Sequence, residues 1–247
     1  MLILYLFLTI IIMSFARNLT AYLFAGYLLF ASPSDAKLHI THEFTPKETK
    51  PVAIVANTTD SASNLIRRAE KYYGKKNIEF AINGTYFAKG KSVGRIVNNG
   101  RQITNGISKH GGAFIYDDSF HGMLDIVDAD KIQYTPEFMQ DGLVPLIPEY
   151  SMSGRRIDQR PRMRQIIGIK KDGNGVIIYE TTTPKGARDI AERYNFVEAA
   201  MGDGGSSALL YKKGHYALKP ARKLKSIIVG VKKYSKRSEE KIDSSPS

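Results

Sequence analysis

The sequence predicts an α+β fold, a single domain of strand-rich mixed sheets with two main helices. Many short apolar or alternating segments are separated by Gly and Asn-Gly turn signals, which is typical of strands. Only two segments place apolar residues at helical spacing, and no internal repeat is present. The 247 residues are enough for one large domain or two small ones.

The expected elements fill residues 37–234, and the charged, Ser-rich tail over residues 235–247 is predicted to be disordered. One helix is expected from Ala62 to Tyr73, ended by Gly74, and the other over residues 185–195. Residues 129–164 are expected to be irregular. Strands are expected over residues 37–44, 52–56, 78–82, 94–97, 112–116, 124–127, 165–170, 176–181, 196–201, 208–211 and 226–231.

Residues 1–36 are predicted to be a signal peptide or a membrane anchor, because this segment is almost wholly apolar. With a start at Met13, the apolar run would end in a Ser34-Asp35-Ala36 cleavage site. With a start at Met1, the longer run could span a membrane and so contact it. In both cases we expect the domain that begins at Lys37 to lie outside the cytoplasm.

Composition narrows the class of partner. The net charge is +12, which favours anionic partners such as an anionic carbohydrate or a phosphorylated glycan. The basic residues are not interleaved with an aromatic platform, so no nucleic-acid partner is expected. The chain has no Cys, which excludes a disulfide, a thiolate metal site and a Cys nucleophile. A solvated basic surface is the alternative explanation of the charge.

The strongest candidate site is the Gly-rich turn, residues 202–207, which two apolar runs flank. Glycine lets backbone N–H groups approach a ligand closely. Asp203 would supply a charge or a base, and the two serines would supply hydroxyls. A tight hairpin is the alternative, because Asp-Gly by itself is a strong turn signal. The ligand-binding candidates here are Gly204, Gly205, Ser206 and Ser207.

Other loops also end apolar segments in groups that could bind a ligand. Asn83 could hold a ligand hydroxyl, and Tyr86 could stack on a sugar ring, although a plain Asn-Gly turn is the alternative. Gln140 precedes an apolar run, where a strand-entry turn is the alternative. Arg164 ends a cluster of five Arg at the mouth of a strand, and an Arg fork matches two phosphate oxygens at once. A solvated loop is the alternative for the rest of that cluster.

The sequence requires no cofactor. Asp203 beside backbone carbonyls could hold Ca²⁺, but no series of ligands is visible. No Lys follows the Gly-rich turn at the place that a P-loop requires, which disfavours phosphoryl transfer from a nucleotide. No Gly-x-Ser-x-Gly elbow is present either.

Five motifs, in order between Ile78 and Lys232, resemble those of the phosphodiester glycosidase family. They are the strand end at residues 81–87, the hairpin at residues 93–100, Gln140-Asp141-Gly142-Leu143, Arg164-Gln165-Ile166-Ile167-Gly168 and Asp203-Gly204-Gly205-Ser206-Ser207. Three positions depart from the family pattern. Leu143 stands in place of Pro, Gln165 in place of Thr or Asn, and Gly202 in place of Leu.

The resemblance implies an exported glycoside hydrolase that cleaves the glycosidic bond of a sugar-1-phosphate diester in an envelope or exopolysaccharide polymer. The leaving phosphate then needs a positive clamp, for which Arg164 and the N–H groups of Gly204 and Gly205 are the candidates. The oxocarbenium-like transition state needs a carboxylate, for which Asp203 is the candidate.

The same resemblance implies that Asn83 and Gln140 hold sugar hydroxyls and that Tyr86 stacks on the sugar. Asp141 and Glu180 are candidates for a second carboxylate. Two other functions stay open from the sequence. The domain could be a non-catalytic module of the same fold that binds an anionic glycan, or a scaffold protein anchored by its N-terminal segment.

Overall fold

The computed structural model describes residues 38–104, 106, 111–118, 123–129, 132–147 and 158–233. The predicted signal or anchor segment, the tail and part of the Arg cluster lie outside these residues. In the part of the chain that is described, no helix is long and apolar enough to cross a membrane.

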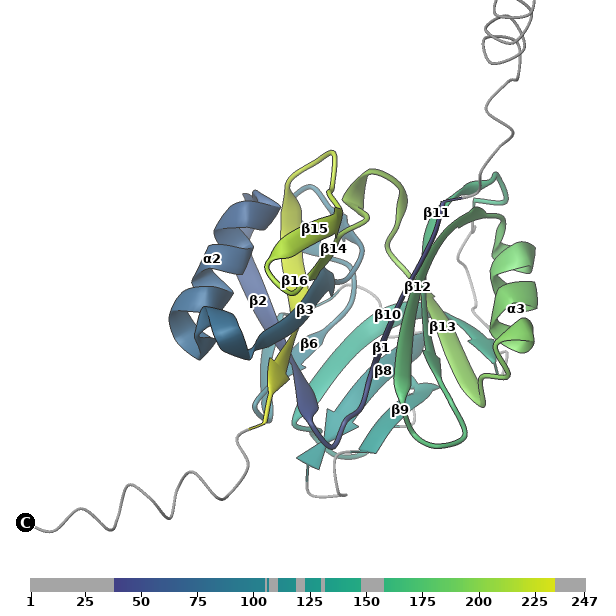
Figure 1. Cartoon of the computed structure of the whole chain (residues 1–247), viewed down its shortest axis with the longest axis horizontal. Helices are drawn as coiled ribbons and strands as arrows, with labels where there is room; N and C mark the ends of the chain where they lie inside the picture. The colour runs from purple at the N-terminus through teal and green to yellow at the C-terminus, as the bar shows by residue number, and fades with distance from the viewer. Residues whose placement is uncertain are drawn as a thin grey trace, which may run out of the picture. The chain divides into compact units, whose positions relative to one another are not determined.

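Strands dominate and form two main sheets (Figure 1). The larger sheet contains β1 (His39–Phe44), β6 (Ile96–Asn98), β7 (Arg101–Thr104), β8 (Gly112–Asp117), β9 (Met123–Asp128), β10 (Phe138–Ile147), β11 (Arg162–Ile169), β12 (Gly175–Thr182) and β13 (Glu198–Gly202). Its order is β1-β12-β11-β13-β10-β6-β7, and β8 pairs with both β10 and β9.

The smaller sheet contains β2 (Thr49–Asp60), β3 (Ile78–Asn83), β14 (Leu210–Lys212), β15 (His215–Leu218) and β16 (Leu224–Lys232). Its order is β15-β14-β3-β16-β2. A separate small hairpin joins β4 (Phe87–Ala88) to β5 (Lys91–Ser92). The helices are α2 (Ala62–Tyr73) and α3 (Pro184–Arg193), with short 3₁₀ turns η1 (Lys75–Asn77) and η4 (Gly205–Ser207).

The main hydrophobic core lies between the two sheets. Phe80 and Ile228 of the smaller sheet pack there with Ile167 and Tyr179 of the larger one. A second cluster joins the outer face of the smaller sheet to α2, and a third joins the outer face of the larger sheet to α3 (Figure 1). Alternate residues of one strand therefore face different layers, which is the period-2 pattern of a strand buried on both faces.

Both helices begin and end where local chemistry predicts. The hydroxyl of Ser61 accepts a hydrogen bond from the N–H of Asn64, and Gly74 ends α2 with a φ of 79°. Thr183 caps α3 in the same way, and Pro184 occupies the first turn, where its missing N–H is not needed. The predicted helix over residues 185–195 is thus confirmed, with bounds shifted by one or two residues.

The predicted α+β class is confirmed, and so are most of the predicted strands. The strand pairs of the described residues are all antiparallel rather than mixed in direction. The prediction of irregular structure over residues 129–164 is wrong, because β10 lies within that range. Its register against β8 shifts between Gln140 and Leu143, and Gly142 adopts a φ of 84°. Because of this bulge and Pro145, the sequence of β10 does not show the simple alternation of apolar and polar residues from which a strand is predicted.

The Gly-rich turn is not a hairpin. The strand before it, β13, belongs to the larger sheet, and the strand after it, β14, belongs to the smaller one. The turn therefore carries the chain across the core from one sheet to the other, so both sheets determine its position.

Close packing at Gly168 on β11 yields a prediction. A Cβ built there would lie 2.2 Å from the ring of Phe196. We expect Gly168→Ala to lower the free energy of unfolding by about 1–3 kcal/mol through overpacking. Gly112→Ala is the matched control, because a Cβ at this strand position meets nothing closer than 3.7 Å. Urea unfolding of both variants measures the difference, and equal stabilities would contradict the packing described here.

Candidate active site

Neighbouring residues on β11 and β12 point to opposite faces of the larger sheet. Gln165 and Tyr179 point inward, where Tyr179 joins the core between the sheets. Arg164 and Glu180 are paired across the two strands. They lie on the same face of the sheet as Ile166 and Ile178, which are two residues away along each strand and pack under α3. The inward pair can therefore reach the Gly-rich turn, whereas the outward pair lies on the α3 face.

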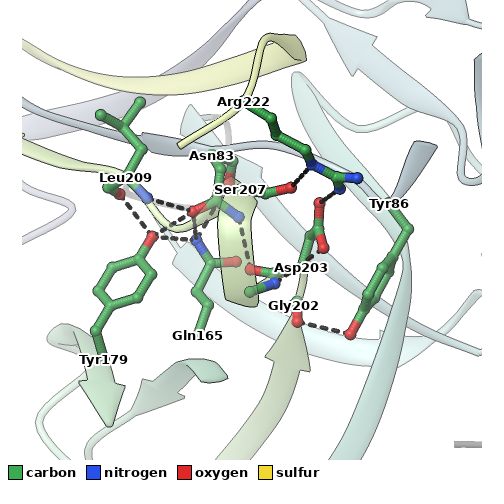
Figure 2. A network of polar contacts seen from close by, with 10 residues as sticks. Asn83, Tyr86, Gln165, Tyr179, Gly202, Asp203, Ser207, Leu209 and Arg222 are labelled. Atoms are coloured by element: carbon green, nitrogen blue, oxygen red, sulfur yellow. Dashed lines mark hydrogen bonds and ion pairs between the residues drawn. The ribbon is translucent and has the colours of Figure 1, made fainter. Parts of the chain in front are cut away.

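The amide of Asn83, at the end of β3, holds the Gly-rich turn (Figure 2). Its Nδ2 donates to the carbonyl oxygen of Asp203 over 2.6 Å. Its Oδ1 accepts from the N–H of Leu209 at 3.0 Å and from Nε2 of Gln165 at 3.3 Å. The hydroxyl of Tyr179 lies 2.7 Å from both Asn83 Oδ1 and the carbonyl oxygen of Leu209. Asn83 is thus a positioning residue for Asp203, and its predicted role in holding a sugar hydroxyl stays a prediction.

The carboxylate of Asp203 is buried and is held by three neighbours. Its Oδ1 accepts from the N–H of Gly204 at 2.9 Å, and its Oδ2 lies 3.2 Å from a terminal nitrogen of Arg222. The nearby hydroxyl of Ser207 also stabilises its charged form and so lowers the pKa of this carboxyl group. The N–H of Gly204 is therefore occupied by Asp203 itself, so this N–H does not point at a ligand as the sequence suggested.

Arg222 pairs with Asp203, and the sequence analysis did not single it out. Its Nε donates to Ser207 Oγ over 2.6 Å, and its guanidinium lies 4.3 Å above the ring of Phe87. Its side chain is nevertheless 43% exposed, and its guanidinium lies between Ser207 and Asp203 (Figure 2). The only sequence signal was its place in a basic stretch, which does not distinguish it from its neighbours.

Burial is the main influence on the acidity of Asp203. Loss of hydration raises the pKa of its carboxyl group, because the charged form is the one that burial disfavours. The donors at Ser207, Arg222 and Gly204 act in the opposite direction but do not cancel this effect. A carboxylate in this setting is a stronger base than an exposed one, which suits a catalytic group.

Arg164 occupies a different environment from the predicted clamp. Its guanidinium is buried and donates to the carbonyl oxygens of Asp158 at 2.6 Å, Arg160 at 3.0 Å and Thr182 at 3.3 Å. These bonds tie the segment before β11 to the end of β12. The side chain therefore has a clear structural role in this conformation, and its predicted role as a phosphate clamp stays a prediction.

Two other predicted ligand-binding residues differ in their surroundings. The hydroxyl of Tyr86 donates to the carbonyl oxygen of Gly202 over 2.7 Å, so its ring lies beside Asp203 (Figure 2). Gln140 is fully buried on the inner face of β10, and neither atom of its amide has a hydrogen-bond partner among the described residues. Such an orphan amide is uncommon in a folded protein. Both of its polar atoms are inaccessible in this conformation, so its predicted role in holding a sugar hydroxyl stays a prediction. Of the two serines, Ser207 is buried and Ser206 is exposed.

Among the described residues, the two candidates for a second carboxylate pair with groups other than Asp203. Asp141 is buried and pairs with Nε of Arg95 over 2.6 Å. Glu180 pairs with Nδ1 of His39 over 2.7 Å, and this cluster lies on the face of β12 opposite Tyr179. Glu180 is thus separated from the Asn83 network by the sheet itself.

The three departures from the family pattern lie together. A Cβ built on Gly202 would lie 2.0 Å from Oε1 of Gln165 and 3.6 Å from Cδ2 of Leu143. A Leu at position 202 would therefore collide with Gln165. The long Gln side chain and the missing side chain at Gly202 compensate for each other, directly beneath Asp203.

Comparison with known proteins supports the resemblance. The family model described as phosphodiester glycosidase matches residues 76–230. No curated protein matches.

Solved structures share the fold. The catalytic domain of zebrafish N-acetylglucosamine-1-phosphodiester alpha-N-acetylglucosaminidase, auto-inhibited by its pro-peptide, is 14% identical with a TM-score of 0.59, covering 81% of this chain and 85% of that one. A hypothetical Synechocystis protein is 13% identical with a TM-score of 0.59, and the match covers 79% of this chain but only 59% of that protein. A Burkholderia pseudomallei K96243 protein described as exported is 9% identical with a TM-score of 0.58, covering 79% and 74%.

The contact between Gly202 and Gln165 can be tested by a double-mutant cycle. We expect Gly202→Ala alone to destabilise the protein by about 1–3 kcal/mol, because the new methyl group meets Gln165. Combined with Gln165→Thr, which removes the obstacle, the same change should have a smaller effect, so the two losses should not add. Chemical denaturation measures all three variants. Gly112→Ala with Gln165→Thr serves as the additive control, and additivity in both pairs would contradict the contact.

Proposed function

The chain belongs to the phosphodiester glycosidase family, and on that premise we propose that it hydrolyses the glycosidic bond of a sugar-1-phosphate diester. The observation that most directly supports this proposal is the ion pair between the buried carboxylate of Asp203 and the half-exposed side chain of Arg222. The substrate has two reacting parts with opposite demands. The sugar becomes electron-deficient in the transition state, and the leaving phosphate gains negative charge.

On the sugar side, the proposed role of Asp203 is to stabilise the oxocarbenium-like transition state or to activate water. Its raised basicity supports either role, since both require a carboxylate that interacts strongly with positive charge or a proton. Tyr86, beside Asp203, would contact the sugar face, and the unpaired amide of Gln140 would hold a hydroxyl.

On the phosphate side, Arg222 fits the clamp better than Arg164. A guanidinium has five N–H groups, and only two of those of Arg222 are used by Ser207 and Asp203. The exposed remainder can donate to phosphate oxygens as their charge increases. Both oxygens of Asp203 already accept hydrogen bonds from the protein, so Arg222 rather than Ca²⁺ is the proposed cation beside it.

The proposed substrate is a phosphodiester-linked glycan of an envelope or exopolysaccharide polymer outside the cytoplasm. The net charge of +12 suits such an anionic polymer. The apolar N-terminal segment and the likeness in fold to a protein described as exported support this location.

Asp203→Asn separates the proposed enzyme from a glycan-binding module. We expect this variant to release sugar from sugar-1-phosphate diesters at least about 10³-fold more slowly than the wild type while it keeps affinity for the diester. Reducing-sugar release and calorimetric binding measure the two quantities. Asp189→Asn is the control. Asp189 is exposed on α3, so this variant should keep full activity. No release by the wild type from any diester, with retained binding of an anionic glycan, would support the binding module.

The pH dependence distinguishes the two arginines. In the proposed mechanism Asp203 acts as an ionised carboxylate, so kcat/KM should fall as the pH is lowered and this carboxylate is protonated. Because burial raises the pKa of Asp203, this fall should begin at a higher pH than the pKa of an ordinary Asp would give. Removing the positive charge in Arg222→Met should raise that pKa further and move the acid limb to higher pH, with lower activity throughout. Arg164→Met should leave the position of the acid limb unchanged, because the guanidinium of Arg164 donates to backbone carbonyl oxygens of Asp158, Arg160 and Thr182 rather than to Asp203. A limb that moves only in the Arg164 variant would contradict this assignment.

A further inference from the structure

A second hollow in the molecule is lined by residues that the proposed reaction does not use. The cavity has a volume of about 380 Å³. It lies between β2, the β4–β5 hairpin, β7 and the start of β16, and neither Asp203 nor Arg222 lines it. Its lining consists of Val55, Ala56, Asn57, Gly90, Lys91, Ser92, Ile103, Thr104 and Lys225.

An irregularity in strand pairing lies in the wall of this hollow. Along β16, Leu224 pairs with Asp60 and Ser226 pairs with Val55, so one residue, Lys225, faces four residues of β2. The looped-out backbone of β2 has carbonyl groups that the ladder does not use. Nζ of Lys225 donates to two of them, at Ala56 over 2.6 Å and at Asn57 over 2.5 Å.

Lys225 is a buried cation with spare donor capacity. Its side chain belongs to a residue only 8% exposed, and no carboxylate among the described residues pairs with it. An ammonium group has three N–H donors, and the two carbonyl oxygens use two of them. A buried charge without a counter-charge is unfavourable. Consistent with this, burial lowers the pKa of Lys225.

The cavity wall contains another unused donor. Ser92 is 4% exposed, and its hydroxyl oxygen is itself buried and has no hydrogen-bond partner among the described residues, so a rotation of this side chain is needed to bring the hydroxyl to a ligand. The neighbouring hydroxyl of Thr104 is already engaged, because it donates to the carbonyl of Gly94 and accepts from the N–H of Ile96. Lys91 also lines the cavity and is exposed, so its ammonium can reach a ligand at the mouth.

We propose that this cavity is a binding site for a phosphate monoester, in which Lys225 and Ser92 bind the phosphoryl oxygens and Lys91 completes the positive field. Two cations and a hydroxyl match a group that has several acceptor oxygens and negative charge. The volume is within the range of small-molecule sites and exceeds what a phosphate group alone would fill, so it suits a phosphate attached to a group of about monosaccharide size. Asp203 and Arg222 do not line this site, although Ser92 pairs across the β4–β5 hairpin with Phe87, on whose ring Arg222 lies.

Binding of glucose 6-phosphate, inorganic phosphate and neutral glucose to the full domain, followed by calorimetry at constant ionic strength, tests the proposal. We expect the phosphorylated sugar to bind and glucose not to bind. Lys225→Met should weaken binding of glucose 6-phosphate by about tenfold or more, and Ser92→Ala should weaken it by several-fold, since each removes a donor to a charged acceptor. Lys223→Met is the control, because this exposed lysine lies two residues away and does not line the cavity.

Two further comparisons make the outcome decisive. Thermal unfolding shows whether Lys225→Met still folds, and Ser92→Ala tests the same site without touching the β2 carbonyls. Arg222→Met should keep the wild-type affinity, because Arg222 belongs to the other site. Loss of binding in Arg222→Met alone would assign the ligand to the Asp203 site and overturn the proposal. Equal affinity in wild type, Lys225→Met and Ser92→Ala, or no binding by the wild type, would also overturn it.

Discussion

The single side chain amide of Asn83 holds together the part of the structure on which the site depends. It ends a strand of the smaller sheet, yet it bonds to Gln165 of the larger sheet and to backbone groups on both sides of the Gly-rich turn. A buried amide of this kind stabilises one arrangement, because any shift of the sheets would leave polar groups without partners. The crossing between the sheets, and with it the position of Asp203, follows from this constraint.

The electrostatics of the site follow from the same geometry. The turn places Asp203 inside the protein, where lost hydration opposes its charge, while Ser207 and Arg222 partly compensate. The aromatic ring of Phe87 and the hydroxyl of Ser207 hold Arg222 in place without covering it. The buried carboxylate and the partly exposed guanidinium thus form one ion pair, and the proposed reaction would use the carboxylate on the sugar and the guanidinium on the phosphate. Arg164, which the motif highlighted, instead orders the backbone that leads into β11.

Sequence motifs singled out residues whose surroundings only the structure could describe, and their roles at a site stay predictions. Asp203 and Gln140 are buried and Tyr86 donates to the carbonyl oxygen of Gly202, but the motifs could not show that the amide of Asn83 is used by the protein itself. They also missed Arg222, because its partner Asp203 lies 19 residues earlier and a lone Arg in a basic stretch has no pattern. The departures from the family pattern at Gly202 and Gln165 looked independent in the sequence, and only their contact shows that one accommodates the other.

Local patterns by themselves determined the helices, most strands and the α+β class, since capping residues, hairpin turns and apolar periodicity act within a few residues of each other. They also determined that a Gly-rich turn with one carboxylate would lie between two buried strands. Only the tertiary structure decided that these strands belong to different sheets, that β10 continues through a bulge, and which arginine pairs with Asp203. Those outcomes depend on contacts between segments far apart in the chain, and on how well polar groups are satisfied after burial, which no local pattern records.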